Sequence, residues 1–257
     1  MKKYSDTKKK PILFKFIRSI MRIFYKDRKL IGVENIPSEP SLIIGNHAQM
    51  HGPLSCEFFF PTKKYIWCIG EMTKCKEVPS YAYKDFWSLK PKWIRWFYKL
   101  LSYLIALPCS YALSRADTIA VYKDARILHT FRESVEKLGE GANIVIFPEC
   151  PTKFNNIVNE FQDKFVDVAR LYYKKYNKEI SFVPMYNAAT LKTIVFGKPI
   201  KFDVNKPIEE QRKVICDYLK KEITRLAEEL PVHTVVPYLN IKKKNYPKSS
   251  DEQIEDK

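Results

Sequence analysis

The sequence has little glycine, no paired cysteines and no long uncharged apolar run. Glycine accounts for only 7 of the 257 residues and hydrophobic residues for 46%, which excludes a fibrous or disordered protein. The six cysteines show no CxxC pair and no short regular spacing: Cys56, Cys68, Cys75, Cys109, Cys150 and Cys216. Scattered cysteines indicate reduced thiols in a cytosolic compartment and argue against a zinc cluster or a disulfide framework.

Long apolar segments are also missing. No stretch of about 18 apolar residues, the usual length of a membrane-spanning helix, is free of charge. The nearest, residues 96–113, is interrupted by Lys99 and Pro108, and a spanning segment there stays open as an alternative. The apolar stretch 11–25 contains three basic residues, which a signal peptide core would not.

Acidic residues are outnumbered, with 29 Asp and Glu against 45 Lys and Arg, a net charge of +16. Residues 1–30 hold eleven basic and two acidic residues, and residues 61–99 hold nine and three, so these two segments carry nearly all of the excess. Such segments favour an anionic surface. Because they alternate basic with long apolar residues and contain no base-reading motif, we expect membrane lipid and not nucleic acid as the partner.

Residues 11–26 have the pattern of an amphipathic helix. Apolar residues recur with helical spacing, and basic residues fall on the opposite face: Leu13, Phe16, Ile17, Ile20, Met21 and Phe24 against Lys15, Arg18, Arg22 and Lys26. This composition is typical of a helix lying in the headgroup region. The alternative is a helix packed on its own domain by the apolar face.

Short apolar segments then alternate with helical patterns. Strands are predicted near residues 41–45, 65–69, 118–122, 143–147, 180–183, 194–196 and 200–202, and helices at 126–138, 160–176 and 208–230. The alternation predicts an α/β fold with a central, mostly parallel or mixed sheet flanked by helices. We expect three parts: a basic tail with a membrane-interface helix (1–30), one domain (31–240) and a charged disordered tail (241–257).

Residues of types common in catalytic and binding sites follow several predicted strands. Asn46 and His47 come directly after one strand, and residues 147–153 with Glu149 follow another. The carboxyl ends of strands are where α/β sheets bind ligands. A histidine there is a candidate general base, since its ordinary pKa suits proton removal at neutral pH. Lys123 follows a third strand.

These blocks, in this order, resemble the four motifs of the glycerophospholipid (lysophosphatidic acid) acyltransferase-like superfamily. The family's Asn-His, four residues, Asp corresponds to Asn46–Gly52, and its Phe-Pro-Glu-Gly-Thr/Ser-Arg to residues 147–153. Its second block ends in Arg where this chain has Lys123, and its Val-Pro-Val strand end corresponds to residues 183–185. The resemblance covers about residues 31–225.

The resemblance implies a role for each matching position. His47 is the general base that deprotonates a glycerolipid hydroxyl, which attacks an acyl thioester. The other positions shape the site for phosphate and glycerol: Asn46, Lys123, Glu149, Cys150, Thr152 and Lys153. Lys in place of Arg binds phosphate only as a point charge, so geometric specificity is expected to be looser.

One departure affects the base directly, because Gly52 stands where the family has the Asp that orients the histidine. Loss of such a carboxylate costs several orders of magnitude in serine hydrolases. Glu57, one turn into the next helix, is the preferred replacement, with His51 and Glu149 as alternatives. A metal site at His47, His51, Cys56 and Glu57 is not expected, because no second ligand cluster supports it.

The sequence therefore predicts an O-acyltransferase at the cytoplasmic face of a membrane, held peripherally or monotopically. It would move a fatty acyl group from acyl-CoA or acyl-carrier protein to a lysophospholipid-type hydroxyl, with no further cofactor. The alternative is a non-catalytic protein that binds anionic lipid on a degenerate acyltransferase fold.

Overall fold

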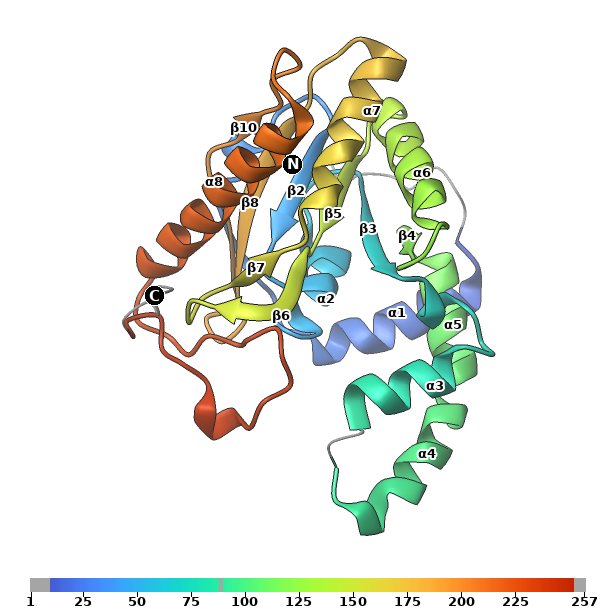
Figure 1. Ribbon diagram of the computed structural model, residues 1–257. Helices are drawn as coiled ribbons and strands as arrows, with labels where there is room; N and C mark the ends of the chain where they lie inside the picture. Colours follow the sequence, from blue (N-terminus) through green and yellow to red (C-terminus); the bar gives the residue numbers. More distant parts are fainter. Residues whose placement is uncertain (1–9, 88–89, 252–257) are drawn as a thin grey trace. The chain divides into compact units, whose positions relative to one another are not determined.

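A computed structural model describes residues 10–87 and 90–251 (Figure 1). The chain forms two compact units. One, the helical unit, comprises the chain up to Lys26 together with Trp67–Thr130. The other, the sheet unit, comprises Asp27–Ile66 and the chain from Phe131 onwards. The region predicted as one domain, 31–240, is thus divided between both units.

The structure contains a mixed, mostly parallel eight-stranded sheet in the order β1-β9-β8-β2-β5-β3-β4, with β10 paired to β8. The strands are β1 (Lys29–Ile31), β2 (Ser41–Gly45), β3 (Lys64–Ile69), β4 (Thr118–Val121), β5 (Asn143–Ile146), β8 (Ser181–Ala188), β9 (Thr193–Phe196) and β10 (Ile200–Lys201). Strand β2 pairs in parallel with both β5 and β8. The predicted fold class is confirmed.

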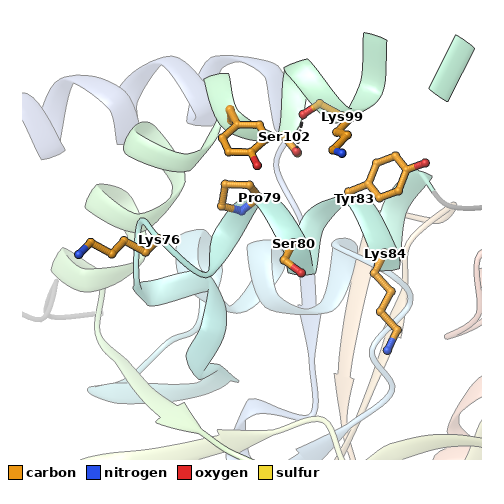
Figure 2. A pocket seen from close by; sticks show the side chains of 8 residues that line it. Lys76, Pro79, Ser80, Tyr83, Lys84, Lys99 and Ser102 are labelled. Carbon is orange, nitrogen blue, oxygen red and sulfur yellow. Dashed lines mark hydrogen bonds between the residues drawn. The ribbon is translucent and has the colours of Figure 1, made fainter. Parts of the chain in front are cut away.

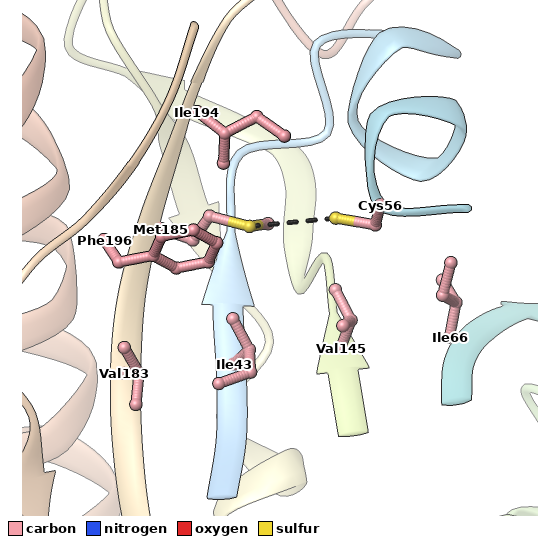
Figure 3. Packing of buried hydrophobic residues seen from close by; sticks show 8 residues of the cluster. All are labelled: Ile43, Cys56, Ile66, Val145, Val183, Met185, Ile194 and Phe196. Carbon is pink, nitrogen blue, oxygen red and sulfur yellow. Dashed lines mark hydrogen bonds between the residues drawn. The ribbon is translucent and has the colours of Figure 1, made fainter. Parts of the chain in front are cut away.

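Both faces of the central strands are buried, as expected for parallel strands covered on each side. On one face, register places four apolar residues in a row across β8, β2, β5 and β3: Val183, Ile43, Val145 and Ile66. Helix α2 (His51–Phe59) brings Cys56 onto this cluster, where its thiol lies 3.7 Å from the sulfur of Met185 (Figure 3). On the other face, Phe182 of β8 packs edge-on against Phe165.

Three further helices belong wholly or mostly to the sheet unit. Helix α8 (Ile208–Glu228) packs on β8, and α7 (Asp167–Tyr176) packs on α8. A bidentate ion pair between Arg212 and Asp167 joins the two helices at 2.7 Å. Helix α6 (Ile127–Gly139) precedes β5 in the chain.

The helical unit contains α1 (Ile12–Phe24), α3 (Val78–Ala82), α4 (Arg95–Leu104) and α5 (Ala106–Arg115). Its core includes Val78, Ala82 and Ala106. Helices α4 and α5 separate at Ile105 because Pro108 has no N–H to bond the carbonyl of Leu104. Within residues 10–87 and 90–251, no helix combines the length and apolar character needed to cross a membrane.

Helix α1 does not pack through the apolar face that the sequence pattern predicts. Its buried contact is Phe14, and it packs near α5. Lys10 at its start pairs with Asp117 at 2.6 Å. Leu13 and Phe16 are more than half exposed, and Ile20 and Met21 are also exposed. The apolar face is therefore not explained by packing on α5. Residues 1–9 of the predicted basic tail lie outside the described residues.

Three predicted boundaries need correction. The helix predicted from Glu160 begins only at Asp167, because Asn159–Phe161 form β7 and pair with β6 (Glu149–Phe154). Residues 149–153, predicted as a loop, therefore belong to a strand. Strand β8 runs through Pro184 to Ala188, since the carbonyl of Pro184 still accepts the N–H of Gly197 at 2.8 Å and the strand gains β9 as an antiparallel partner.

The chain after α8 folds back on the sheet unit. Residues 241–251 begin the predicted disordered tail, yet Val235 donates to the carbonyl of Pro247 at 2.8 Å and Ser249 donates to that of His233 at 2.9 Å. We call residues 231–251 the C-terminal strap. Residues 252–257 lie outside the described part of the chain.

Candidate active site

The site lies at one edge of the sheet, where parallel strands β2, β5 and β8 end. Asn46 and His47 follow β2, and Glu149 follows β5 after Phe147 and Pro148. Asn187 is the penultimate residue of β8. Parallel strands present their carboxyl ends at the same edge, so residues distant in sequence converge there. The structure thus brings together Asn46, His47 and Glu149.

Asn46 fixes the start of the loop after β2. Its buried side chain accepts the N–H of Asn187 at 2.7 Å and donates to the carbonyl of Asn187 at 3.3 Å. Asn187 in turn bonds Ser55 on α2 at 3.2 Å. Asn46 therefore joins the loop to β8 and, through Asn187, to the helix that follows it.

Glu149 links the loop after β2 to strand β7. One carboxylate oxygen accepts the backbone N–H of His47, and the other accepts the N–H of Asn159 at 2.9 Å. The side chain is 3% exposed. Burial raises its pKa to about 7, although the two amide hydrogen bonds act in the opposite direction. In the structure Glu149 holds the backbone of His47, and its part in shaping the site for phosphate and glycerol stays a prediction.

Glu149→Gln tests the buried carboxylate through the pH dependence of stability. The raised pKa favours the protonated form in the folded chain, so its contribution to stability is complete below about 4.5 and is lost as the pH rises through about 7. Between pH 5 and pH 8, the free energy of unfolding of the wild type should fall relative to the variant by ~1–3 kcal/mol. Urea titrations at both pH values measure this. A constant difference would contradict the raised pKa.

His47 has a defined tautomer. Its Nδ1 faces the backbone carbonyl of Gln49, which can only accept, so Nδ1 carries the proton and Nε2 carries the lone pair. Among the described residues, none hydrogen-bonds to Nε2. Burial lowers the pKa of His47 below its usual 6.5. The rings of Phe147 and Tyr238 stand edge-on to the imidazole at 5.3 and 5.5 Å.

The turn after His47 leaves no room for a side chain at position 52, which is occupied by Gly52. Ala48 and Gln49 both adopt left-handed backbone conformations (φ 45° and 53°), which turns the Gln49 carbonyl toward Nδ1. The N–H of Gly52 donates to the His47 carbonyl at 2.9 Å. A Cβ at Gly52 would lie 2.6 Å from the carbonyl oxygen of His47 and 2.9 Å from that of Asn46. This turn thus supplies an acceptor for the histidine while leaving no room for a carboxylate.

The C-terminal strap holds the Gln49 turn. The side-chain amide of Gln49 donates to the hydroxyl of Tyr246 at 2.8 Å. Tyr238 of the same strap contacts the His47 ring. The strap therefore touches both His47 and the residue whose carbonyl faces its Nδ1.

Tyr246→Phe removes the acceptor for the Gln49 amide while keeping the ring. We expect the left-handed turn to loosen, and kcat for any reaction in which His47 is the base to fall about three- to tenfold. Nitrogen NMR of the His47 imidazole provides a readout independent of turnover, because the Nδ1-protonated fraction should fall. Tyr218→Phe, which loses a hydroxyl bonded to Lys198 instead, is the matched control. Equal effects of the two variants would exclude a role for the strap.

The three residues predicted to replace the missing Asp make no hydrogen bond to Nδ1 of His47 among the described residues, because Nδ1 faces Gln49. Glu57 forms an ion pair with Lys64 at 2.8 Å. The partner of Nδ1 of His47 is the backbone carbonyl of Gln49. His51 begins α2 and is half-buried, and its pKa is lowered by burial and by Arg28 and Lys243. Glu149 reaches the backbone of His47 rather than its ring.

The remaining predicted residues fall in two places. Cys150 follows Glu149 on β6, and its thiol lies 3.2 Å from the carbonyl of Glu160 and 2.9 Å from the hydroxyl of Thr152. Thr152 and Lys153 are exposed on the same strand. Lys123 is exposed after β4 and belongs to the helical unit. No group of three or more His, Cys, Asp or Glu within the described ranges could hold a metal ion.

Sequence reasoning missed Gln49, Asn187, Tyr238 and Tyr246. The carbonyl of Gln49 acts through left-handed conformations at Ala48 and Gln49, positions where neither glycine nor asparagine signals them. Tyr238 and Tyr246 lie beyond the last predicted helix, near and within the segment predicted as tail. Only Asn187 lies close to a sequence motif, since it follows residues 183–185, which resemble the Val-Pro-Val strand end.

Comparison with known proteins supports the fold. No protein-family model matches the sequence, and no curated protein matches it. The structure is similar to the crystal structure of the 1-acyl-sn-glycerophosphate (LPA) acyltransferase PlsC from Thermotoga maritima, with a TM-score of 0.50 and 16% sequence identity. The match covers 85% of this chain and 81% of that one. At this identity the similarity concerns the fold, which is that of an LPA acyltransferase.

Proposed function

We propose that this chain, which has an acyltransferase-like fold, is a membrane-associated O-acyltransferase. It moves a fatty acyl group from acyl-CoA or acyl-carrier protein to the hydroxyl of a lysophospholipid-type acceptor. The observation that carries the proposal is the contact between Nδ1 of His47 and the backbone carbonyl of Gln49, since a carbonyl only accepts, which makes Nδ1 the protonated nitrogen and leaves Nε2 as the base. His47 also lies just after the carboxyl end of β2, where α/β sheets bind ligands, and this placement supports the same proposal.

The reaction follows from that tautomer. Nε2 takes the proton of the acceptor hydroxyl as its oxygen attacks the thioester carbonyl carbon. The C–S bond then breaks, and the imidazolium returns the proton to the departing thiolate. The Gln49 carbonyl orients the ring through Nδ1 but, being uncharged, stabilises the imidazolium less than a carboxylate would. We therefore expect a modest kcat.

Membrane attachment follows from the exposed faces of the helical unit. The exposed apolar residues of α1, such as Phe16 and Ile20, are accompanied by basic residues and by no acidic residue between Lys10 and Lys26. This combination of apolar and basic faces favours the interface of an anionic bilayer. The acceptor and product would dissolve in the same bilayer.

A non-catalytic lipid-binding role is the second candidate, favoured by the absence of a carboxylate at Gly52. Purified protein, anionic vesicles, labelled acyl-CoA and a panel of lysolipids separate the two functions. Labelled diacyl product above the protein-free rate supports the enzyme. Sedimentation with vesicles without turnover on any acceptor, including with acyl-carrier protein as donor, would leave only the binding role.

A further inference from the structure

The C-terminal strap carries a loop whose end is exposed and basic. Residues 239–245, which we call the strap tip, are all exposed and have the sequence Leu-Asn-Ile-Lys-Lys-Lys-Asn. Figure 1 shows this part of the chain in red, beyond α8, as a loop with a short helical turn at Lys243–Asn245. Leu239 and Ile241 are 41% and 40% exposed. The strap tip therefore presents apolar and cationic side chains together.

The base of this loop is tied to the sheet. The hydroxyl of Tyr186, on β8, lies 2.8 Å from Nε2 of His233, and the hydroxyl of Thr190 donates to the carbonyl of Thr234 at 2.8 Å. His233 and Val235 are buried. The position of the loop on the sheet unit is therefore set by contacts with β8 and the turn after it.

The strap tip lies next to the candidate active site. The residues on its two sides both contact the loop after β2: Tyr238 stands edge-on to the His47 ring at 5.5 Å, and the hydroxyl of Tyr246 accepts the Gln49 amide at 2.8 Å. Met50, the residue after Gln49, is 50% exposed and adds an apolar side chain at the same place. A partner bound to the strap tip would therefore lie beside His47.

The positive charge of the strap tip is not neutralised by neighbouring carboxylates. In the described part of the chain, no ion pair includes Lys242, Lys243 or Lys244, and the sequence has no Asp or Glu between residues 231 and 250. Burial lowers the pKa of His51, and the charges of Arg28 and Lys243 lower it further. The positive potential therefore extends from the strap tip to the start of α2.

A group of lysines in the helical unit is arranged differently. Lys76, Lys84 and Lys99 line a cavity of about 540 Å³ between α3 and α4. Figure 2 shows the side chains of Lys76 and Lys84 pointing away from each other. They do not present one cationic surface, whereas the three lysines of the strap tip are consecutive and exposed.

The chemistry of the strap tip matches an anionic bilayer. Lysines near such a surface are attracted by its headgroups, and apolar side chains beside them enter the boundary of the acyl chains. A soluble polyanion would satisfy the lysines but would leave Leu239, Ile241 and Met50 in water.

We propose that the strap tip binds the headgroups of an anionic bilayer, with Leu239, Ile241 and Met50 at the boundary of the acyl chains. This contact belongs to the sheet unit and is separate from that of α1. Its part in acyl transfer rests on the proposed function: it would hold His47 at the surface in which the acceptor lipid is dissolved.

Lysine footprinting tests the contact directly. The full chain is treated with an amine-acylating reagent, and mass spectrometry measures the modification of each lysine. Vesicles of phosphatidylcholine and phosphatidylglycerol should slow modification of residues 242–244 about fivefold or more. Lys174, Lys178 and Lys213, exposed on the sheet unit, are the internal controls. Vesicles of phosphatidylcholine alone should protect neither set. Equal protection of both sets by the anionic vesicles, or of neither, would overturn the proposal.

Single-stranded RNA, at the same concentration of phosphate, distinguishes the bilayer from another polyanion. The vesicles are expected to protect residues 242–244 at concentrations about tenfold lower, because only they also take up the apolar side chains. Equal protection by RNA would overturn the bilayer as the partner of the strap tip.

A charge-matched pair of variants adds a measurement of affinity. Lys242→Gln/Lys243→Gln/Lys244→Gln should weaken binding to the anionic vesicles about tenfold more than Lys174→Gln/Lys178→Gln/Lys213→Gln, which loses the same charge. Circular dichroism verifies that both variants fold. Equal losses would show that only net charge matters and would contradict a specific surface.

Turnover separates this inference from the proposed function. Footprinting and vesicle binding need no reaction, so a chain without acyl transfer would refute the proposed function and leave the contact intact. In an active chain, the variant at residues 242–244 should raise KM for an acceptor in anionic vesicles about tenfold, with kcat for a short-chain monomeric acceptor unchanged. An unchanged KM would show that the contact does not serve the reaction.

Discussion

Replacing His47 by alanine is expected to lower kcat for acyl transfer by about 10²–10⁴-fold, the usual contribution of a positioned general base. The carboxylate of Glu149 and the amide of Asn46 bind backbone groups at the site and provide no alternative base aligned by Gln49. Vesicle binding should not change, since the exposed apolar residues of α1 lie in the helical unit. Product formation and vesicle sedimentation measure the two quantities.

His129→Ala is the matched control, because His129 is exposed on α6. The pH profile adds a second readout. Since burial lowers the pKa of His47, the imidazole stays neutral below its usual 6.5, and the acid limb of the wild-type kcat profile should lie below that pH. Equal turnover of wild type and His47→Ala would exclude His47 as the base. An acid limb well above 6.5 would exclude its neutral, buried state.

The placement of the site could be predicted from the sequence because its strands are short buried apolar runs. Ile43, Val145 and Val183 belong to three such runs, and register confirms that they lie side by side in the sheet. Once these strands are parallel, the residues after them must share one edge. The sequence alone therefore predicts that Asn46, His47 and Glu149 share one site.

The partner of His47 could not be predicted in this way. Sequence patterns report side chains, so they point to Glu57, His51 and Glu149 as replacements for the Asp. The acceptor in the structure is instead a backbone carbonyl, that of Gln49. Left-handed conformations at Ala48 and Gln49 have no sequence signal, since neither residue favours them. The division into two units could not be predicted either. Its boundary between Ile66 and Trp67 falls inside the apolar run of β3, where the sequence shows no linker.

Restoring the family's carboxylate by Gly52→Asp is expected to lower activity rather than raise it. Any Cβ at this position lies 2.6 and 2.9 Å from the backbone carbonyls of His47 and Asn46 and 2.9 Å from the Phe147 ring. Backbone atoms cannot move away cheaply, so the turn that presents the Gln49 carbonyl must open. We expect kcat to fall on the order of 10²-fold and the free energy of unfolding to fall by ~1–3 kcal/mol.

Gly52→Ala separates the steric effect from the charge, since it introduces the same Cβ without a carboxylate. Both variants should lose activity together, measured as initial rates beside urea unfolding. Gly141→Ala is the control: its φ of 79° is unfavourable for alanine, but its Cβ meets nothing within 4 Å, so stability should fall without loss of kcat. If Gly52→Asp instead exceeded the wild type while Gly52→Ala did not, the turn would have room for a carboxylate, and the Gln49 carbonyl would be only an inferior substitute for it.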